Sequence, residues 1–468
     1  MNVSKPLVLL CAAATCSLIM LDTNIVAVAL PSIARELHAG FVSIQWVISA
    51  YLITFASLLL PSGTLADRHG RRRMVMIGIA VFLVSSATCG LATSALVLEL
   101  SRAVQGIGAS MLLTAALAII SSTFRGAERA RAYAIWGTSI GAAMTCGPIL
   151  GGIITGLFGW RWAFLINVPL CIVFLVAIRA FVPESRDPEE RRLDVAGVLA
   201  LSTGLFLLVW ALIDGNAEGW LSPPILERVA AATLLLIVFV IVERVQIQPM
   251  LDFELLSHPR YVGAASAMFG YGAAAQVMVF FLPLYLQSWM GLAPMAAGFA
   301  MLPFALPLVI APPLAAHFLE RLTHRSRLVI GLGIAALGDL LIGVSAHAGA
   351  PYPVMTVAML VAGIGTGLLN PETARAMQAQ ATPERAGMAS GIGATIRFVS
   401  LVIGVAVLGA VFHAGFAVSA FVAVGIALLA LVGTAILLRQ EGWVQAERSS
   451  REDSYGTRRP WAPAAHRS

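Results

Sequence analysis

The chain has 468 residues, of which 59% are hydrophobic and only 12% are charged. A soluble protein carries about 25% charged residues, so this composition argues against soluble enzymes, nucleic-acid binders and disordered scaffolds together. The net charge of +6 comes from basic residues between apolar runs and in the tail. A nucleic-acid binder would instead gather them on one face, so lipid is the expected surrounding and no nucleic acid is expected to bind.

Apolar runs long enough to cross a bilayer, which takes about 20 residues of helix, follow one another along the whole chain. In chain order they cover about 7–30, 43–64, 73–93, 95–122, 131–156, 161–181, 194–213, 226–245, 260–288, 294–318, 327–346, 352–377, 386–412 and 416–438. The alternating pattern of membrane β-barrels is absent from the sequence. We therefore predict an all-α integral membrane protein with 14 transmembrane helices.

The N-terminus resembles a signal peptide at first sight, because Lys5 precedes an apolar stretch with three consecutive alanines. The apolar run continues past Asp22 to Leu30, however, which is longer than the apolar region of a signal peptide. We therefore expect an uncleaved first span.

The orientation is predicted from the basic residues, because cytoplasmic loops are enriched in Lys and Arg. With the N-terminus inside, the inner segments hold 25 of the 30 Lys and Arg residues, and the outer loops hold only Arg35, Arg161 and Arg228. We therefore expect a multi-pass protein of the inner (plasma) membrane with both termini in the cytoplasm.

An internal repeat divides the chain. The loop GTLADRHGRRR at 63–73 resembles AHFLERLTHR at 316–325, and Glu-Arg-Ala at 128–130 resembles the same triplet at 384–386. The similar offsets, 253 and 256 residues, indicate two homologous halves, as in many secondary transporters. The alternative is that inner loops are generically rich in arginine.

The repeat predicts four parts. We expect a six-helix bundle over 1–182, an inserted helix pair with flanking loops over 183–258, a second six-helix bundle over 259–438 and a disordered cytoplasmic tail over 439–468. The tail is rich in Arg, Ser and Pro, a composition that does not form a packed core.

Several motifs occur in order along the chain: LDTNIVAVALP (21–31), GTLADRHGRRR (63–73), RAVQGIGA (102–109), GPILGG (147–152), WRWAFLINVP (160–169), PLYLQSWMGLAPMAAG (283–298) and the segment 387–404. Together they resemble the major facilitator superfamily, and within it the 14-helix drug:proton antiporter family. The sequence departs from that pattern at Asn24, Ala27 and Ala143. The resemblance implies two pseudo-symmetric six-helix bundles plus an inserted pair, and transport by alternating access.

Asp22 lies inside the first apolar run, where an ionised carboxylate costs about 2.5–3.5 kcal/mol. At about 1.5 Å per helical residue, Asp22 and Arg102 lie at similar depths in the membrane. We hypothesise a switchable ion pair, which Arg102 stabilises when close and which opens for protonation of Asp22 when the halves move. A static pair that only fixes helix packing is the alternative.

The resemblance assigns two further groups of residues. The antiporter motif, which would seal the interface between the halves, consists of Gly147, Pro148, Gly151 and Gly152. Tight helix packing alone is the generic alternative. The loop whose charge contacts would hold one conformation and break in the other contains Gly63, Asp67, Arg68, Gly70 and Arg71.

Charged residues also lie inside the apolar runs of the second half. Glu372, close to Arg375 in sequence, is a candidate for proton coupling or for a cationic substrate, and an interfacial ion pair is the alternative. Arg397 and Asp339 lie near mid-depth and are a candidate pair.

A central substrate cavity is expected to be apolar and aromatic with few polar anchors. Aromatic faces attract cations, so such a lining suits amphipathic, cationic organic molecules. The candidates for this lining are Trp136, Phe269, Tyr271, Gln276, Met278, Tyr285 and Arg397. For each of them, packing against helices or lipid is the alternative.

The sequence therefore predicts a proton-coupled exporter of drugs or of an endogenous metabolite. Uptake of a small polar solute is the alternative that GPILGG disfavours, and a transport-inactive sensor or scaffold is disfavoured by Asp22 and Arg102. An enzyme, a metal site and a cofactor are not expected, because HExxH, paired cysteines and a Walker A motif are absent from the sequence and no GxSxG lies in a strand-turn-helix. The expected partners are a small-molecule substrate, protons and membrane lipid, and the chain is expected to be a monomer.

Overall fold

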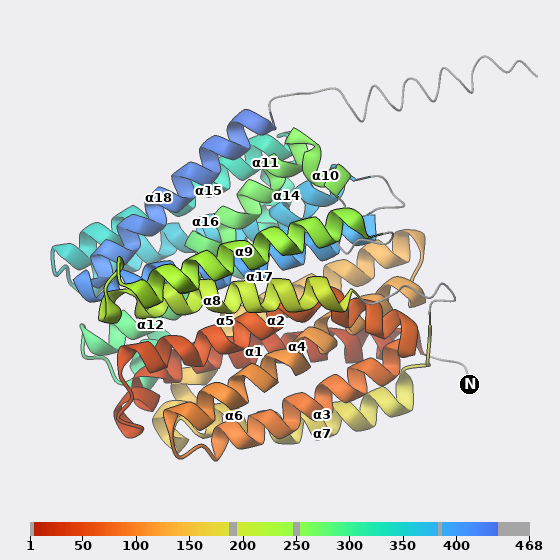
Figure 1. The fold of residues 1–468 in the computed structure, drawn as a ribbon, viewed down its shortest axis with the longest axis horizontal. Coiled ribbons are helices and arrows are strands. Elements are labelled where there is room, and N and C mark those ends of the chain that lie inside the picture. The colour runs from red at the N-terminus through yellow and green to blue at the C-terminus, as the bar shows by residue number, and fades with distance from the viewer. Residues whose placement is uncertain (1–3, 187–193, 247–252, 382–385, 439–468) are drawn as a thin grey trace, which may run out of the picture.

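The computed structural model describes residues 4–186, 194–246, 253–381 and 386–438, and every regular element in these ranges is helical. Fourteen helical spans in this part of the chain are long and apolar enough to cross a membrane, as predicted. Figure 1 shows the helices lying lengthwise beside one another. The expected tail at 439–468 and most of the second repeat triplet lie outside the described residues.

The first six spans form one group of packed helices. Their elements are α1 (Lys5–Glu36), α2 (Phe41–His69), α3 (Arg71–Gly90), α4 (Ala95–Thr123), α5 (Gly126–Phe158), α6 (Trp162–Leu165) and α7 (Asn167–Phe181). Helix α4 packs against α2 and α3, α1 packs against α5, and α3 packs against α7. Several helices are longer than the predicted apolar runs, because the polar residues that follow a run also belong to the helix. Helix α2, for example, continues to His69.

The next two spans form a helical hairpin of α8 (Val195–Glu218) and α9 (Pro223–Val245). They run across the middle of Figure 1, between the red and orange helices and the blue ones. Helix α8 packs against α9, α2 and α17 (Ala386–Ala410), so the hairpin contacts both groups of helices.

The last six spans form the second group. Besides α17, its elements are α10 (Phe253–Ser257), α11 (Pro259–Gly270), η1 (Tyr271–Gln276), α12 (Met278–Ser288), α13 (Pro294–Ala300), α14 (Leu302–Phe318), α15 (His324–His347), α16 (Tyr352–Ala379), η2 (Phe412–Ala414) and α18 (Phe416–Leu437). Segment η1 is a π-helical stretch inside the span that α11 and α12 complete. Such stretches often mark functional sites.

The same close helix contacts occur in both groups. A Cβ on Gly106 of α4 would overlap the Tyr51 carbonyl oxygen of α2, and one on Gly363 of α16 would overlap the Phe304 carbonyl oxygen of α14. Small residues allow helix backbones to approach in this way. The two contacts involve equivalent elements, which supports the internal repeat.

The two groups meet where α1 packs against α12, α5 against α13 and α14, and α2 against α17. We call the end of the molecule that holds the α2–α3 turn, with Arg68 and Arg71, the basic end. The other end, which holds the α5–α6 turn and η2, is called the opposite end. The basic end is the predicted cytoplasmic end.

Candidate proton and substrate sites

Asp22 is fully buried, and donors from two other helices reach both of its carboxylate oxygens. Arg102 Nη1 of α4 donates to Oδ2 at 2.8 Å. Asn167 Nδ2 of α7 and Gln105 Nε2 of α4 donate to Oδ1 at 2.7 and 3.1 Å. An ionised carboxylate only accepts hydrogen bonds, so this is the environment that such a group needs inside a membrane.

A serine on α3 fixes the two amide side chains. Ser86 Oγ accepts a hydrogen bond from Gln105 Nε2 at 3.0 Å and another from Asn167 Nδ2 at 2.9 Å. Each amide nitrogen carries two hydrogens, so one goes to Ser86 and the other to Asp22. The amides therefore cannot turn away from the carboxylate without losing both bonds.

Arg102 is equally enclosed, with 1% of its surface exposed. Its Nη1 also donates to Gln105 Oε1 at 2.7 Å, its Nε donates to the Val47 carbonyl oxygen at 3.2 Å, and its guanidinium lies 4.1 Å from the Tyr51 ring centroid. Breaking a buried ion pair by removing one partner costs about 3–5 kcal/mol. Replacing either Asp22 or Arg102 alone should therefore destabilise the fold, because the remaining charge would be buried without its partner.

The structure brings together Asp22 and Arg102, the two residues that the depth argument paired. It adds Gln105, Asn167 and Ser86, for which no role was predicted from the sequence. Gln105 and Asn167 lie within quoted motifs, RAVQGIGA and WRWAFLINVP, so a polar residue inside an apolar run was the available signal. Ser86 gave no such signal, because single serines are common in membrane helices.

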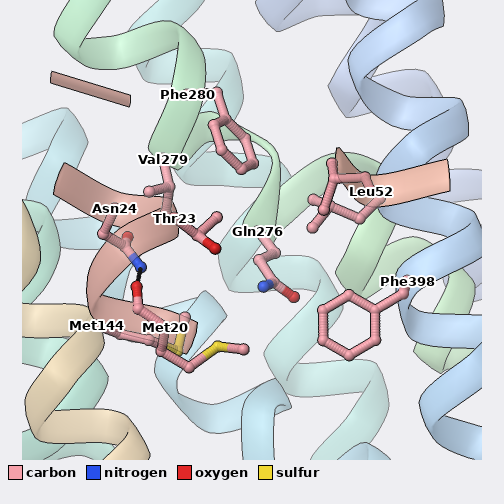
Figure 2. A pocket seen from close by; sticks show the side chains of 10 residues that line it. Met20, Thr23, Asn24, Leu52, Met144, Gln276, Val279, Phe280 and Phe398 are labelled. Atoms are coloured by element: carbon pink, nitrogen blue, oxygen red, sulfur yellow. Dashed lines mark hydrogen bonds between the residues drawn. The ribbon is translucent and has the colours of Figure 1, made fainter. Parts of the chain in front are cut away.

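A small cavity lies between the two groups of helices (Figure 2), and Thr23, the residue after Asp22, lines it. Its volume is ≈ 10 Å³, room for about one water molecule. Its lining is mainly apolar and consists of Met20, Thr23, Asn24, Leu52, Met144, Gln276, Val279, Phe280, Phe398 and Leu401. Asn24 Nδ2 donates to the Met20 carbonyl oxygen at 2.6 Å, and among the described residues Asn24 Oδ1 has no partner.

Of the predicted lining residues, Gln276 lines this cavity and Arg397 contacts Gln276. Gln276 lines it from the end of η1. Arg397 Nε donates to Gln276 Oε1 at 3.0 Å, and Arg397 Nη2 donates to the Tyr271 hydroxyl at 3.1 Å. Arg397 is not itself a lining residue, and its bond to Gln276 connects it to the cavity wall.

The other predicted lining residues lie elsewhere in this conformation. The Tyr285 ring stacks on Phe416 at 4.4 Å, within an aromatic cluster at the opposite end. Trp136 of α5 packs edge-on against Tyr133 at 6.3 Å. Met278 is fully buried and Phe269 is 36% exposed. Their role in a cavity of another conformation stays a prediction.

Glu372 is buried near the basic end of α16 and is surrounded by basic groups. His324 Nδ1 lies 2.6 Å from its Oε1, and Arg327 Nη1 and Arg375 Nη1 lie 3.4 and 3.7 Å from its Oε2. The sequence indicated Arg375 only. His324 and Arg327 come from α15, so the cluster ties the first turns of α15 to the last turns of α16.

Asp339 and Arg397 were a candidate pair, and the described residues include no ion pair between them. Asp339 is 1% exposed, and its Oδ2 has no hydrogen-bond partner within the described ranges.

The GPILGG motif forms the contact of α5 with α1 and α13. Cβ atoms on Gly147 and Gly151 would collide with Asn24 and with the backbone of Ile25. A Cβ on Gly152 would lie 2.7 Å from the Pro294 carbonyl oxygen. Pro148 leaves its own carbonyl oxygen beside Gly298. These residues therefore hold α5 against both groups of helices.

The α2–α3 turn holds the predicted switch loop. Asp67 Oδ1 accepts hydrogen bonds from Arg71 Nε at 3.0 Å and Nη2 at 2.8 Å. Gly70 makes the turn with a φ of 106°, where a Cβ would also collide with Glu184. Gly63 faces Thr114 of α4, and Arg68 is exposed.

Glu184 was not predicted from the sequence. Its carboxylate accepts hydrogen bonds from the backbone N–H groups of Arg72 and Arg73, at 3.0 and 3.2 Å, at the start of α3. A carboxylate there satisfies donors that have no partner within the helix. Glu184 therefore joins the segment after α7 to the switch loop.

Comparison with known proteins identifies the family. The model of the Major Facilitator Superfamily matches residues 12–405 and also residues 264–467. The chain belongs to the major facilitator superfamily. As a superfamily member it is a transporter of small molecules rather than an enzyme, and the described residues contain no cluster of side chains suited to a metal ion.

Its similarity to other superfamily members extends over most of the chain. It is 35% identical over 416 residues to the multidrug resistance protein Stp of Mycobacterium tuberculosis, covering 88% of this chain and 77% of that protein. It is 30% identical over 416 residues to the methylenomycin A resistance protein of Streptomyces coelicolor, covering 87% of each. A crystal structure of the peptide transporter POT in complex with sulfate shares the fold, with a TM-score of 0.69, 17% identity and 95% coverage of both chains.

Proposed function

We propose that the chain exports amphipathic small organic molecules by alternating access, driven by protons that bind Asp22. The observation that carries this proposal is the buried Asp22–Arg102 pair, whose atoms lie 2.8 Å apart. The similarity to two resistance proteins supports export rather than uptake. The substrate is a drug or an endogenous metabolite, and protein partners are not required by this proposal.

The geometry suggests how proton binding and movement are coupled. Helix α1 holds Asp22 on the side of α4 and α7, and it holds Thr23 and Asn24 on the side of the cavity. The same helix packs against α12 of the second group. Protonation of Asp22 would weaken its bond to Arg102 and thereby loosen the position of α1 at the interface. We propose that the two groups then move relative to each other as units.

The test replaces Asp22 with Asn, which keeps the shape of the side chain and removes its charge. Inside-out vesicles that contain the full chain are given a pH gradient and two transported probes in separate assays, ethidium as an amphipathic cation and naphthalene-2-carboxylate as an amphipathic anion. We expect D22N to lose proton-driven transport by about tenfold or more, since general proton-transfer groups typically contribute at least that factor.

The matched control is E128Q, the same type of change at an exposed ion pair with Lys5. Thermal unfolding of each purified variant shows whether the fold is retained. A well-folded D22N protein with unchanged proton-driven transport would refute the role of Asp22.

A further inference from the structure

Arg397 is a charged residue in the middle of a membrane span, and its partners in the structure are neutral. It donates to the Gln276 amide oxygen and to the Tyr271 hydroxyl. Among the residues that the structure describes, no carboxylate forms an ion pair with it. A guanidinium stays charged in proteins, so the second group of helices keeps an uncompensated positive charge beside the central cavity.

Arg397 differs from the buried Arg102 of α4 in having no counter-ion among the described residues. Arg102 is 1% exposed, and Asp22 neutralises it at 2.8 Å. Arg397 is only partly buried and has no such counter-ion in the described part of the chain. Charged side chains inside membranes are expected to pair or to face a water-filled path. Within the described residues, Arg397 therefore presents an uncompensated charge to which an anion could bind.

The unused donors of Arg397 fit a carboxylate. A guanidinium has five N–H groups, and only one on Nε and one on Nη2 have partners within the described residues. Both N–H groups of Nη1 and one of Nη2 are left. Adjacent donors on Nη1 and Nη2 form the fork that binds the two oxygens of a carboxylate.

The cavity wall next to Arg397 offers a further hydrogen-bond donor for an anion. Because the Gln276 oxygen faces Arg397, its amide nitrogen is turned toward the cavity (Figure 2). The remaining wall is mainly apolar, with Phe280, Phe398 and Leu401 among its side chains. This combination suits a molecule with an apolar body and one anionic end. The lining contains no carboxylate that would suit a cation.

We propose that Arg397 and Gln276 bind the carboxylate of an amphipathic organic acid, which is the substrate class of this transporter. This inference rests on the proposed function, because it assumes that the substrate passes through the small cavity between the two groups of helices. It replaces the cationic substrate that was expected from aromatic composition alone. The cavity of ≈ 10 Å³ must widen before such an acid can enter, so binding requires that the two groups of helices separate.

The experiment measures equilibrium binding of naphthalene-2-carboxylate to the full-length protein in phosphatidylcholine vesicles. The matched probes are the corresponding amide, which has the same shape without charge, and naphthalen-2-ylmethylammonium, which carries the opposite charge. We expect the acid to bind about tenfold more tightly than the amide, as charge-assisted hydrogen bonds imply. R397Q should lose this preference, and R397K should keep part of it because the charge remains without the fork.

The control variant is R35Q, which removes an exposed arginine whose side chain donates to Ser32. It should keep the wild-type preference, and thermal unfolding should show that R397Q and R397K are folded. Equal binding of the acid and the amide to the wild type, or an unchanged preference in R397Q, would overturn the proposal.

A second arm adds phosphatidylglycerol to the vesicles, because a lipid headgroup could supply the anion. Displacement of bound acid by this lipid, with acid binding intact in its absence, supports an anion site open to the substrate. Binding of the lipid without any binding of the acid overturns the substrate assignment. The binding assay needs no pH gradient, so a failure of proton coupling at Asp22 would leave this result readable.

Discussion

At the scale of single residues, the donors around Asp22 determine how firmly the carboxylate is held. Replacing Asn167 with Leu removes the bond of 2.7 Å to Asp22 Oδ1. A hydrogen bond to a charged group contributes about 1.5–3 kcal/mol, so N167L should lower the midpoint of thermal unfolding. S86A should have the smaller effect, because Ser86 contacts the amides rather than the carboxylate. A larger loss in S86A than in N167L would contradict this order.

Two glycines of α5 allow a matched test of close packing. A methyl group at Gly152 would lie 2.7 Å from the Pro294 carbonyl oxygen and 2.9 Å from Gly298 Cα, whereas one at Gly137 meets nothing within 4 Å. Overpacking costs about 1–3 kcal/mol, and Ala is otherwise the better helix former by about 0.5–1 kcal/mol.

G152A should therefore unfold at a lower temperature than the wild type, and G137A at the same or a higher temperature. If both changes lowered the unfolding temperature equally, the contact of Gly152 with α13 would not be the cause of the effect.

Residue-level prediction from the sequence succeeded where depth alone decides which residues can meet. Asp22 and Arg102 form an ion pair in the structure, and their similar depths were estimated from regular helices in the predicted orientation. Depth does not determine which side of a helix a residue occupies, as Tyr285 illustrates. The π-helical segment η1 changes the helical register before α12, and one additional residue rotates the following side chains by about 100° at 3.6 residues per turn. In this structure Gln276 lines the small cavity, whereas Tyr285, beyond the π-helical segment, stacks on Phe416.

At the scale of elements, the α8–α9 hairpin is held at its turn by one arginine. Arg228 of α9 donates to Asp214 at 3.1 Å and to Glu218 at 3.0 Å, and its guanidinium lies 4.3 Å from the Trp210 ring. Trp210 Nε1 donates to the same Asp214 oxygen at 2.6 Å. The cluster therefore closes the end of the hairpin where the chain reverses.

R228M should loosen this turn while leaving the transmembrane part of the hairpin intact. A partly exposed ion pair contributes up to about 1 kcal/mol, which corresponds to about fivefold faster local opening. Hydrogen exchange of the backbone amides at 214–222, measured by mass spectrometry, should rise by that factor. Exchange in α15, far from the change in the chain, serves as the internal reference, and an unchanged rate at 214–222 would argue against the cluster.

At the scale of the whole molecule, the distribution of charge predicts the orientation in the membrane. The basic end, with Arg68 and Arg71, should face the cytoplasm. Green fluorescent protein fused after Ser468 should therefore fluoresce, and alkaline phosphatase fused there should be inactive. The reverse should hold for fusions placed after Trp220, in the α8–α9 turn. An active phosphatase after Ser468 would invert the predicted topology.

The number and order of spans could be predicted from the sequence because an apolar run of helical length has few alternatives in lipid. Contacts between helices could be predicted only for Asp22 and Arg102, whose depths matched. His324 and Glu372, or Glu184 and the start of α3, are brought together by packing of helices that short-range patterns do not describe. The network of Asp22 was half predicted, since its charges were visible and its neutral donors were not.

The single-water size of the central cavity has a consequence for energy conservation. Protons cross proteins rapidly along continuous rows of hydrogen-bonded water, and a space of ≈ 10 Å³ holds about one molecule. Apolar side chains such as Leu52, Val279 and Phe280 surround it. At this cavity the described residues therefore leave no room for such a row of water molecules. For the proton-driven export that we propose, such an interface would keep the gradient from discharging through the protein.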